Sequence, residues 1–313
     1  MPRTGLRSAF GIAAMLASAG LIAACGSGAE DLAASAAGPE SGGVQADKVD
    51  AIASQVPAQF RDAGQLVFGQ GTGQSQYPPI AFSTVDDPTL VGLLPDIEDL
   101  IAGTFGLDKV DKKDSFEGAF LGLESGKYDI LVSQIDINKD REEKYDMSSF
   151  AVNKYAFLTE KGSDLTVKGP EDLAGKTVAI KPGTAQAGLL DQWNAEVTGK
   201  GLAPIDIKGY GETSSSYLAL KSGKVEAYLT IGAVADYHAA QDDSDVRIAG
   251  YFPLPKEDSL LGIVTKKGSG LAQPVCDVIN HAIDTGQYQQ ILDRWHLGEY
   301  GVDRCEVNPP TGH

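Results

Sequence analysis

Two stretches of the chain share one short pattern, in which a helix ends at Ser-Gly-Lys and a strand follows directly. Leu123-Glu-Ser-Gly-Lys-Tyr-Asp-Ile-Leu in the first half matches Leu220-Lys-Ser-Gly-Lys-Val-Glu-Ala-Tyr-Leu in the second half. Glycine often ends a helix because it adopts the left-handed backbone conformation without a steric cost. The repeated helix–strand order predicts an α/β chain with two similarly built lobes.

The spacing of apolar residues, together with glycine and proline boundaries, predicts the other elements. Helices are expected over residues 47–60, 94–105, 116–124, 215–222, 271–284 and 287–295, and one more runs from a turn at 181–186 to about residue 197. Strands are expected over residues 66–70, 128–132, 177–180, 205–208, 226–230 and 260–265. The first half therefore reads β-α-α-β, for which a parallel sheet is the simplest packing.

A run of polar side chains follows the expected strand at 128–132. It brings together a hydroxyl, an amide, a carboxylate and a guanidinium group, on Ser133, Gln134, Asp136 and Arg141. Ligands of open α/β sheets bind just beyond the carboxyl ends of the strands. These residues are therefore candidates for binding a small polar ligand. The alternative is an ordinary surface loop with a surface arginine.

A second candidate site lies at the turn that follows the strand at 177–180. Gly183-Thr184-Ala185-Gln186 stands at the expected start of a helix, where backbone N–H groups and the helix dipole favour an anion. Arg141 can bind the same anion from the other lobe through its planar guanidinium group. Tyr77 and Phe116 are candidates for the apolar walls of such a site, and alternatively they are core aromatics.

The first 24 residues have the pattern of a bacterial lipoprotein signal peptide. Arg3 and Arg7 precede an apolar stretch at 9–24, and small residues come directly before Cys25. Cleavage before Cys25 would leave a lipid on its thiol and anchor the mature protein on the outer face of the cell membrane without spanning it. A plain secretion signal with an incidental cysteine is the alternative. The composition of residues 25–47 indicates a flexible tether.

Charge and motifs exclude several classes of function. The net charge of the chain is −17, and it becomes −19 once Arg3 and Arg7 are removed, which speaks against nucleic acid as a partner. There is no Gly-x-Ser-x-Gly or His-Glu-x-x-His motif, and the histidines lack the spacing of metal ligands. The sequence therefore predicts no catalytic residue, metal or cofactor. The histidines are His238, His281, His296 and His313.

Cys276 and Cys305 are the cysteines that remain after Cys25. An exported chain with two remaining cysteines is expected to pair them. The disulfide would hold the C-terminal tail, residues 306–313, against the helix that carries Cys276. Two buried free thiols are the alternative.

Over residues 65–297 the chain resembles the bacterial extracellular solute-binding proteins of the polar amino acid type (family 3), in their lipoprotein form. These include the histidine-, glutamine- and lysine/arginine/ornithine-binding proteins of ABC importers. The motifs that carry the resemblance are Tyr77-Pro78-Pro79, Val91-Gly92-Leu93-Leu94-Pro95-Asp96, Ser125-Gly126-Lys127-Tyr128-Asp129 with the segment to Arg141, Gly175-Lys176-Thr177-Val178-Ala179 with Gly183-Thr184, and Gly286-x-Tyr288 with Trp295.

The resemblance implies a two-lobed periplasmic-binding-protein-like fold of type II. Each lobe would be a mostly parallel sheet with flanking helices, and two strands would form the hinge. Lobe 1 would comprise residues 48–153 and 254–305, and lobe 2 would comprise residues 154–253.

The resemblance also assigns roles to the ligand-binding candidates. Arg141 matches the arginine that binds the ligand α-carboxylate, and Gln74 matches a position that senses the ligand side chain. The other matches are Ser133, Gln134 and Asp136 beside the carboxylate, Thr184, Ala185 and Gln186 in the second lobe, and Tyr77 and Phe116 flanking the ligand.

Two positions depart from the family pattern. Asp136 stands where the family usually has serine or threonine, and Ile231 stands where it usually has an acidic residue that holds the α-ammonium group. A buried ammonium needs an anionic or carbonyl partner, and Ile231 is neither. Either Asp136 takes over that role, or the ligand lacks an α-amino group.

Together these features predict a lipid-anchored, monomeric binding protein and no enzyme. Its ligand would be an amino acid or a related small zwitterion or cation, and its partner would be an ABC importer permease. One alternative is a ligand sensor that acts on a separate membrane partner. Others are a periplasmic dehydratase-like enzyme of the same fold and a structural lipoprotein.

Overall fold

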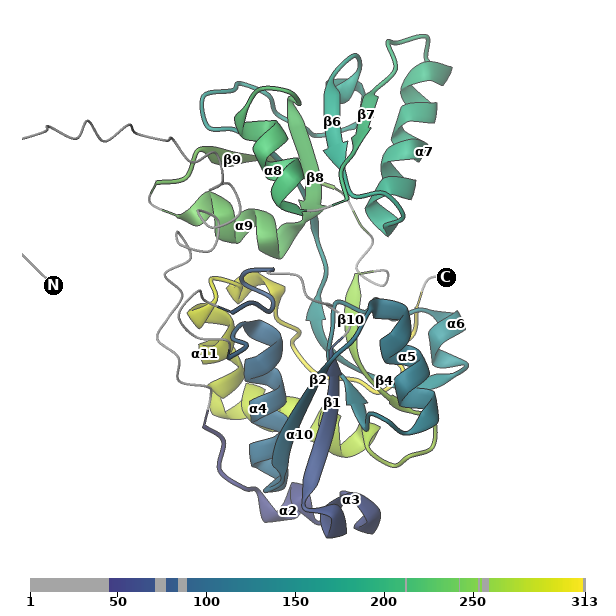
Figure 1. Ribbon diagram of the computed structural model, residues 1–313, viewed down its shortest axis with the longest axis vertical. Helices are drawn as coiled ribbons and strands as arrows, with labels where there is room; N and C mark the ends of the chain where they lie inside the picture. The colour runs from purple at the N-terminus through teal and green to yellow at the C-terminus, as the bar shows by residue number, and fades with distance from the viewer. Residues whose placement is uncertain are drawn as a thin grey trace, which may run out of the picture.

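The computed structural model describes residues 45–70, 77–83, 89–211, 213–241, 243–252, 254 and 259–311. The expected signal peptide, most of the expected tether, Cys25 and Gln74 lie outside these residues. Within them the chain forms two lobes, each built on one five-stranded sheet, and Figure 1 shows one lobe above the other.

The sheet of the first lobe has the strand order β2-β1-β3-β10-β4. Strand β1 pairs in parallel with β2 and β3, whereas β10 runs antiparallel to β3 and β4. The strands are β1 (Gln65–Gln70), β2 (Asp108–Lys113), β3 (Ile130–Leu131), β4 (Tyr145–Val152) and β10 (Leu260–Lys266).

The sheet of the second lobe has the order β7-β6-β8-β5-β9 and repeats this arrangement. Strand β6 is parallel to β7 and β8, and β5 is antiparallel to β8 and β9. The strands are β5 (Tyr155–Glu160), β6 (Thr177–Ile180), β7 (Asp206–Gly209), β8 (Ala227–Ile231) and β9 (Val246–Phe252). Both sheets are therefore mixed, with an antiparallel half that the expected "mostly parallel" sheet did not include.

Helices cover both faces of each sheet, as an α/β core requires. In the first lobe α4, α10 and α11 pack on one face of the sheet and α5 packs on the other. No helix of the described residues is both long and apolar enough to cross a bilayer. The first lobe has α2 (Asp50–Ala53), α3 (Ala58–Ala63), α4 (Leu93–Phe105), α5 (Phe116–Ser125), α6 (Lys139–Glu142), α10 (Ala272–Thr285), α11 (Gln287–Arg294) and the 3₁₀ helix η3 (Gly298–Tyr300). The second has η1 (Pro170–Leu173), α7 (Ala185–Gly199), α8 (Thr213–Lys221) and α9 (Gly232–Ala240).

The chain crosses between the lobes twice, from β4 to β5 and from β9 to β10. Two short crossings of this kind are the geometry of a hinge. We propose that the lobe boundaries lie at these crossings. Lobe 1 is then formed by residues 48–153 and 254–305, and lobe 2 by residues 154–253.

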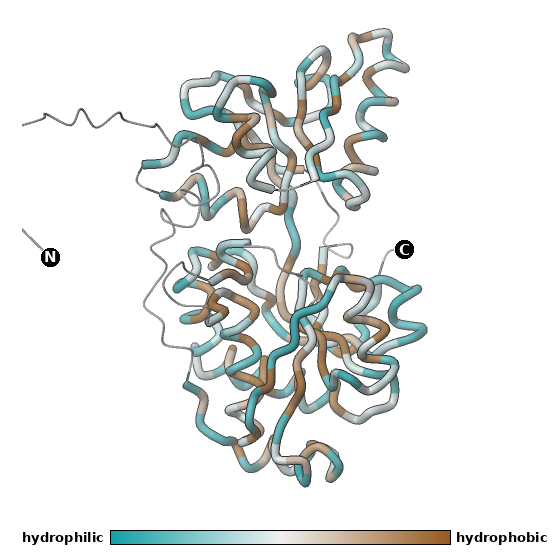
Figure 2. The backbone as a smooth tube through the Cα atoms, in the orientation of Figure 1, coloured by the Kyte–Doolittle hydropathy of each residue, from teal (hydrophilic) through white to brown (hydrophobic). Residues whose placement is uncertain are grey.

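The structure corrects several expected elements. The helix expected over 47–60 is divided into α2 and α3, because Pro57 lacks the N–H that a continuous helix needs and instead caps the start of α3. The first half is β-α-β-α-β, since β2 lies between α4 and α5. Strand β2 was missed because it is a largely exposed strand at the edge of the sheet. Its residues are mostly hydrophilic, as the colours of Figure 2 show. Strands β4, β5 and β9 and helix α9 were also not expected.

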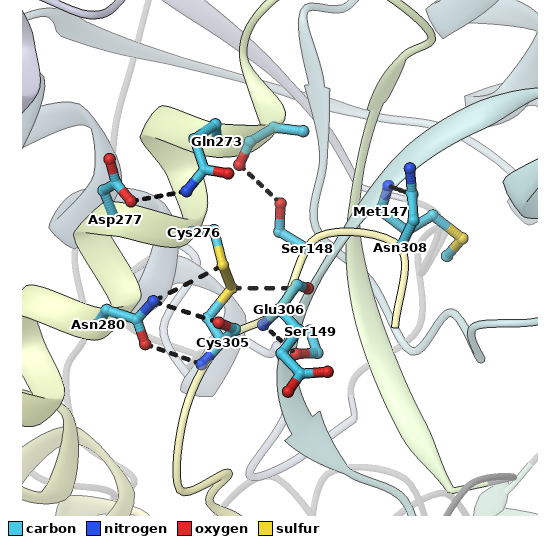
Figure 3. Close-up of a disulfide and its surroundings, with 11 residues drawn as sticks. Met147, Ser148, Ser149, Gln273, Cys276, Asp277, Asn280, Cys305, Glu306 and Asn308 are labelled. Carbon is cyan, nitrogen blue, oxygen red and sulfur yellow. Dashed lines mark hydrogen bonds between the residues drawn. A yellow bond between two sulfur atoms is a disulfide. The ribbon is translucent and has the colours of Figure 1, made fainter. Parts of the chain in front are cut away.

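Cys276 and Cys305 are joined in the expected disulfide, with their Cα atoms 5.4 Å apart. Asn280, one turn after Cys276, holds the same tail through its side chain, which accepts from Cys305 N at 2.9 Å and donates to Cys305 O at 3.2 Å (Figure 3). Beyond the disulfide the tail runs beside β4, where Ser149 N donates to Glu306 O and Asn308 N donates to Met147 O. The tail is thereby attached to α10 and β4 of the first lobe.

Candidate functional site

A cavity of about 450 Å³ lies between the two lobes. This volume is in the range of small-molecule sites. Ten of the eleven ligand-binding candidates lie within the described residues, and all ten line this cavity. They are Tyr77, Phe116, Ser133, Gln134, Asp136, Arg141, Thr184, Ala185, Gln186 and Ile231.

Nine further residues line the cavity. Ile180 ends β6, and Lys181 and Gly183 follow it, so the rule that placed Arg141 could have found these three. Three others lie within β8, and one begins α8. Asn153 and Tyr155 are different, because they belong to the β4–β5 crossing, which was not expected from the sequence. The nine are Asn153, Tyr155, Ile180, Lys181, Gly183, Thr213, Tyr228, Leu229 and Thr230.

Arg141 is held in place from several sides on the wall of lobe 1. Its backbone N–H donates to the side chain of Asn138, the N-cap of α6, at 3.0 Å. Its Nη1 donates to the backbone carbonyl of Asp136 at 2.6 Å. Its guanidinium carbon lies 5.7 Å from the centre of the Phe116 ring and 5.8 Å from that of Phe120. These contacts fix a guanidinium group at the edge of the cavity, where it can bind a carboxylate.

Partial burial and neighbouring charge act on Arg141 in opposite directions. Loss of solvent lowers the pKa of its guanidinium group, and the nearby carboxylate of Asp136 works against this shift. Because the ordinary pKa of arginine is above 12, the group remains a cation at physiological pH.

The N-terminus of α7 forms the facing wall in lobe 2. Thr184 caps this helix, since its hydroxyl accepts from Ala187 N at 3.3 Å and donates to Lys181 O at 2.8 Å. Gly183 has a φ of 75°, which lets the chain turn sharply into the helix. Ala185 and Gln186 thus stand in the first turn, where N–H groups have no partner within the helix. This end of a 15-residue helix favours an anion.

Asn153 connects the crossing between the lobes to Asp136. Its side-chain nitrogen donates to Asp136 Oδ1 at 2.9 Å and to the hydroxyl of Tyr155 at 3.3 Å. Burial raises the pKa of Tyr155, and the charge of Asp136 adds to this shift, so Tyr155 remains a neutral phenol. Asp136 therefore lies beside Arg141 on one side and beside neutral hydrogen-bonding groups on the other.

Apart from Lys181, the rest of the described wall is neutral. Burial raises the pKa of Tyr77, the neighbouring Tyr228 adds to the rise, and a hydrogen bond with Thr230 opposes it. Ile231, the last residue of β8, packs against the hydrophobic clusters of both lobes. Among the described residues that line the cavity, Asp136 supplies the one carboxylate, and Arg141 and Lys181 supply the cations.

This arrangement is suited to binding a small zwitterion. A carboxylate would lie between Arg141 and the start of α7, and Asp136 offers a negative charge close by. Within the described part of the chain, no group of histidine, cysteine, aspartate and glutamate side chains could hold a metal ion.

Comparison with known proteins agrees with this geometry. The model of the family described as "Bacterial extracellular solute-binding proteins, family 3" matches residues 71–299, a range that includes parts of both lobes. The arginine-binding protein ArgT of Corynebacterium glutamicum is 26% identical over 267 residues, which cover 84% of each chain. The L-cystine-binding protein TcyJ of Escherichia coli K12 is 26% identical over 246 residues, which cover 78% of this chain and 85% of the relative.

The fold agrees with solved structures as well. An ancestral arginine-binding protein bound to arginine has a TM-score of 0.59 and 27% sequence identity. The superposition covers 74% of this chain and 98% of that protein.

Proposed function

The chain belongs to family 3 of the bacterial extracellular solute-binding proteins, and we propose that it captures an amino acid between its two lobes and delivers it to an ABC importer. The observation that carries the proposal is the cavity between the lobes, with Arg141 on one wall and the N-terminus of α7 on the other. Two relatives are named for binding amino acids, arginine and L-cystine.

Capture would begin with the ligand carboxylate. The guanidinium group of Arg141 offers a planar fork of N–H donors that matches a carboxylate, and the first-turn amides of α7 add donors from the other lobe. Tyr77 and Phe116 would flank the rest of the ligand. Since the two walls belong to different lobes, the ligand would favour the closed arrangement, and the two crossings would act as the hinge.

The anchoring of the protein is a separate part of the proposal. Cys25 would carry a lipid and hold the domain on the outer face of the cell membrane, with residues 25–47 as the tether. The domain would act as a monomer and a binding protein rather than an enzyme, and the permease of the importer would be its partner. The support for the anchor is the signal pattern of residues 1–24.

The proposal is tested by thermal unfolding of the purified mature protein with single ligands. The panel holds L-arginine, L-cystine, the other standard amino acids, amines, small carboxylates and sugars. A ligand at about 100 times its dissociation constant stabilises the folded state by about 2.7 kcal/mol, which raises Tm by roughly 5–10 °C for a domain of this size. We expect such a shift with at least one amino acid, and a shift with sugars alone would contradict the proposal.

A further inference from the structure

Asn153 stands in an unusual position for a polar side chain. It lies between β4 and β5, where the chain crosses from one lobe to the other, and it lines the cavity with only 6% of its surface exposed. Its Oδ1 atom is buried and receives no hydrogen bond from any residue that the structure describes. A buried amide oxygen without a donor is unfavourable, so this atom is suited to receiving a donor from a bound molecule.

The orientation of the Asn153 amide is set by its neighbour. The carboxylate of Asp136 accepts hydrogen bonds and, when ionised, donates none, so it is the NH₂ group of Asn153 that faces Asp136 Oδ1. The carbonyl oxygen of the amide must then point elsewhere. Asp136 and Asn153 both line the cavity, and together these adjacent side chains carry a negative charge and a second, buried acceptor.

We propose that Asp136 and Asn153 Oδ1 form the subsite for the ammonium group of the ligand, on lobe 1 and the interlobe crossing. This inference rests on the proposed capture of an amino acid and deepens it by assigning the groups that recognise the cation. An ammonium group has three donors and needs acceptors, of which at least one should be charged when the site is buried. Asp136 supplies the charge, and Asn153 supplies the acceptor for which no described residue provides a donor.

The opposite wall offers no equivalent. In lobe 2 the last three residues of β8, Leu229, Thr230 and Ile231, line the cavity. None of the described lining residues of lobe 2 carries a carboxylate. On lobe 1, by contrast, Arg141 Nη1 donates to the backbone carbonyl of Asp136 at 2.6 Å. The groups for a carboxylate and for an ammonium are thus adjacent, as the short separation of these two charges in an α-amino acid requires.

The position of Asn153 also links this subsite to the hinge. The backbone N–H of Asn153 donates to the carbonyl of Ser259, which precedes β10 on the second crossing. The two crossings are therefore hydrogen-bonded to each other at Asn153, the residue that an ammonium group would contact. Ligands that lack the ammonium would miss this contact.

The test compares each amino acid with its deaminated form by isothermal titration calorimetry. The probes are L-arginine with 5-guanidinopentanoate and L-cystine with 3,3′-dithiodipropanoate. If the wild type binds neither amino acid, the tightest-binding standard L-amino acid replaces them, paired with its 2-hydroxy acid. The variants are Asp136→Asn and Asn153→Ala, and the matched control is Asp140→Asn, an exposed carboxylate on α6 outside the cavity.

We expect Asp136→Asn to weaken binding of the amino acid about 30-fold or more, because it removes the charged partner of a buried ammonium. Asn153→Ala should weaken it about 10-fold. The affinity for the deaminated form should change less than about 3-fold in both variants. The control Asp140→Asn should change the affinity for either ligand by less than about 3-fold. The thermal midpoint of each ligand-free variant shows that it is folded, and the isosteric Asp136→Asn is interpretable even if Asn153→Ala does not fold.

The outcomes separate this inference from the proposed function. Equal losses for the amino acid and its deaminated form would overturn the ammonium subsite and leave amino acid capture standing. So would a wild type that binds the deaminated forms more tightly than the amino acids. A wild type that binds no amino acid would overturn both.

Discussion

Arg141 donates a hydrogen bond from Nη1 to the backbone carbonyl of Asp136, 2.6 Å away. The residue that we propose for the ligand carboxylate is therefore held against the residue that we propose for the ligand ammonium. The rings of Phe116 and Phe120 lie within 6 Å of the same guanidinium group. A side chain fixed in this way loses less conformational entropy when a ligand binds, which favours affinity.

Phe116 should contribute to affinity through Arg141. We expect Phe116→Ala to weaken binding of the amino acid ligand about 2- to 5-fold, because the ring is partly exposed and cation–π contacts at such sites are modest. Isothermal titration measures the change. The control is Leu121→Ala on the same helix, since Leu121 is also exposed but lies outside the cavity. An equal loss in both variants would argue against a role for the ring.

Tyr300 should influence the relative position of the lobes. Its hydroxyl, on η3 of lobe 1, donates to Asp236 Oδ2 on α9 of lobe 2, and Tyr251 of lobe 2 donates to Asp236 Oδ1 at 2.5 Å. We expect Tyr300→Phe to change ligand affinity about 3-fold or more by shifting the balance between lobe arrangements, since one hydrogen bond is worth about 1–2 kcal/mol.

The matched control for this link is Tyr251→Phe, which removes a bond to the same carboxylate from within lobe 2. Titration of both variants with the same amino acid compares them directly. If Tyr251→Phe changes affinity as much as Tyr300→Phe does, the effect comes from Asp236 itself and not from the link between the lobes.

Glu98 should make stability depend on pH. Its side chain is fully buried on α4, and burial raises its pKa well above the ordinary value, with Asp111 adding to the rise and Lys109 opposing it. Gln70 donates to Glu98 Oε2 at 2.7 Å, and the other oxygen of each group is buried without a partner among the described residues. A protonated Glu98 could donate its proton to Gln70 Oε1, which would satisfy both atoms.

The sign of the effect follows from this raised pKa. The folded state keeps the proton on Glu98 while the unfolded chain releases it at an ordinary pKa near 4.3, so this contribution to stability is complete below that value. It is lost as the pH rises from the unfolded pKa towards the folded one. Urea unfolding of the wild type and Glu98→Gln at pH 4.5, 6 and 7.5 measures it. We expect the variant to gain stability relative to the wild type as the pH rises. A difference in unfolding free energy that does not change with pH would contradict a protonated Glu98 in the folded state.

The disulfide should stabilise lobe 1. Cys276 and Cys305 are 29 residues apart, and a loop of this length corresponds to about 3–4 kcal/mol in the chain-entropy description. We expect the double variant Cys276→Ala, Cys305→Ala to have a Tm several degrees lower. The Asn280 side chain binds the backbone N–H and carbonyl of residue 305, so these hydrogen bonds are kept in the variant. The tail should therefore remain attached, and ligand affinity should change little. An unchanged Tm would show that these hydrogen bonds suffice.

Much of the site could be predicted because ligands bind beyond the carboxyl ends of strands. That rule and the family resemblance placed Arg141, Asp136 and Thr184, which line one cavity in the structure. Strand β2 could not be predicted, since an exposed edge strand of the sequence Asp-Lys-Val-Asp-Lys-Lys has no apolar pattern. Asn153 could not be predicted either. Its position depends on the crossing from β4 in one sheet to β5 in the other, which local sequence does not reveal.

The most direct test of the central claim is the affinity of the wild type and of Arg141→Ala for the amino acid that gives the largest thermal shift. If the lobes capture an amino acid by its carboxylate, the wild type binds it with one site per chain. Arg141→Ala should then lose about 2–5 kcal/mol of binding free energy, a factor of roughly 30 or more. Equal affinity of the two proteins, measured by isothermal titration, would contradict capture at this site.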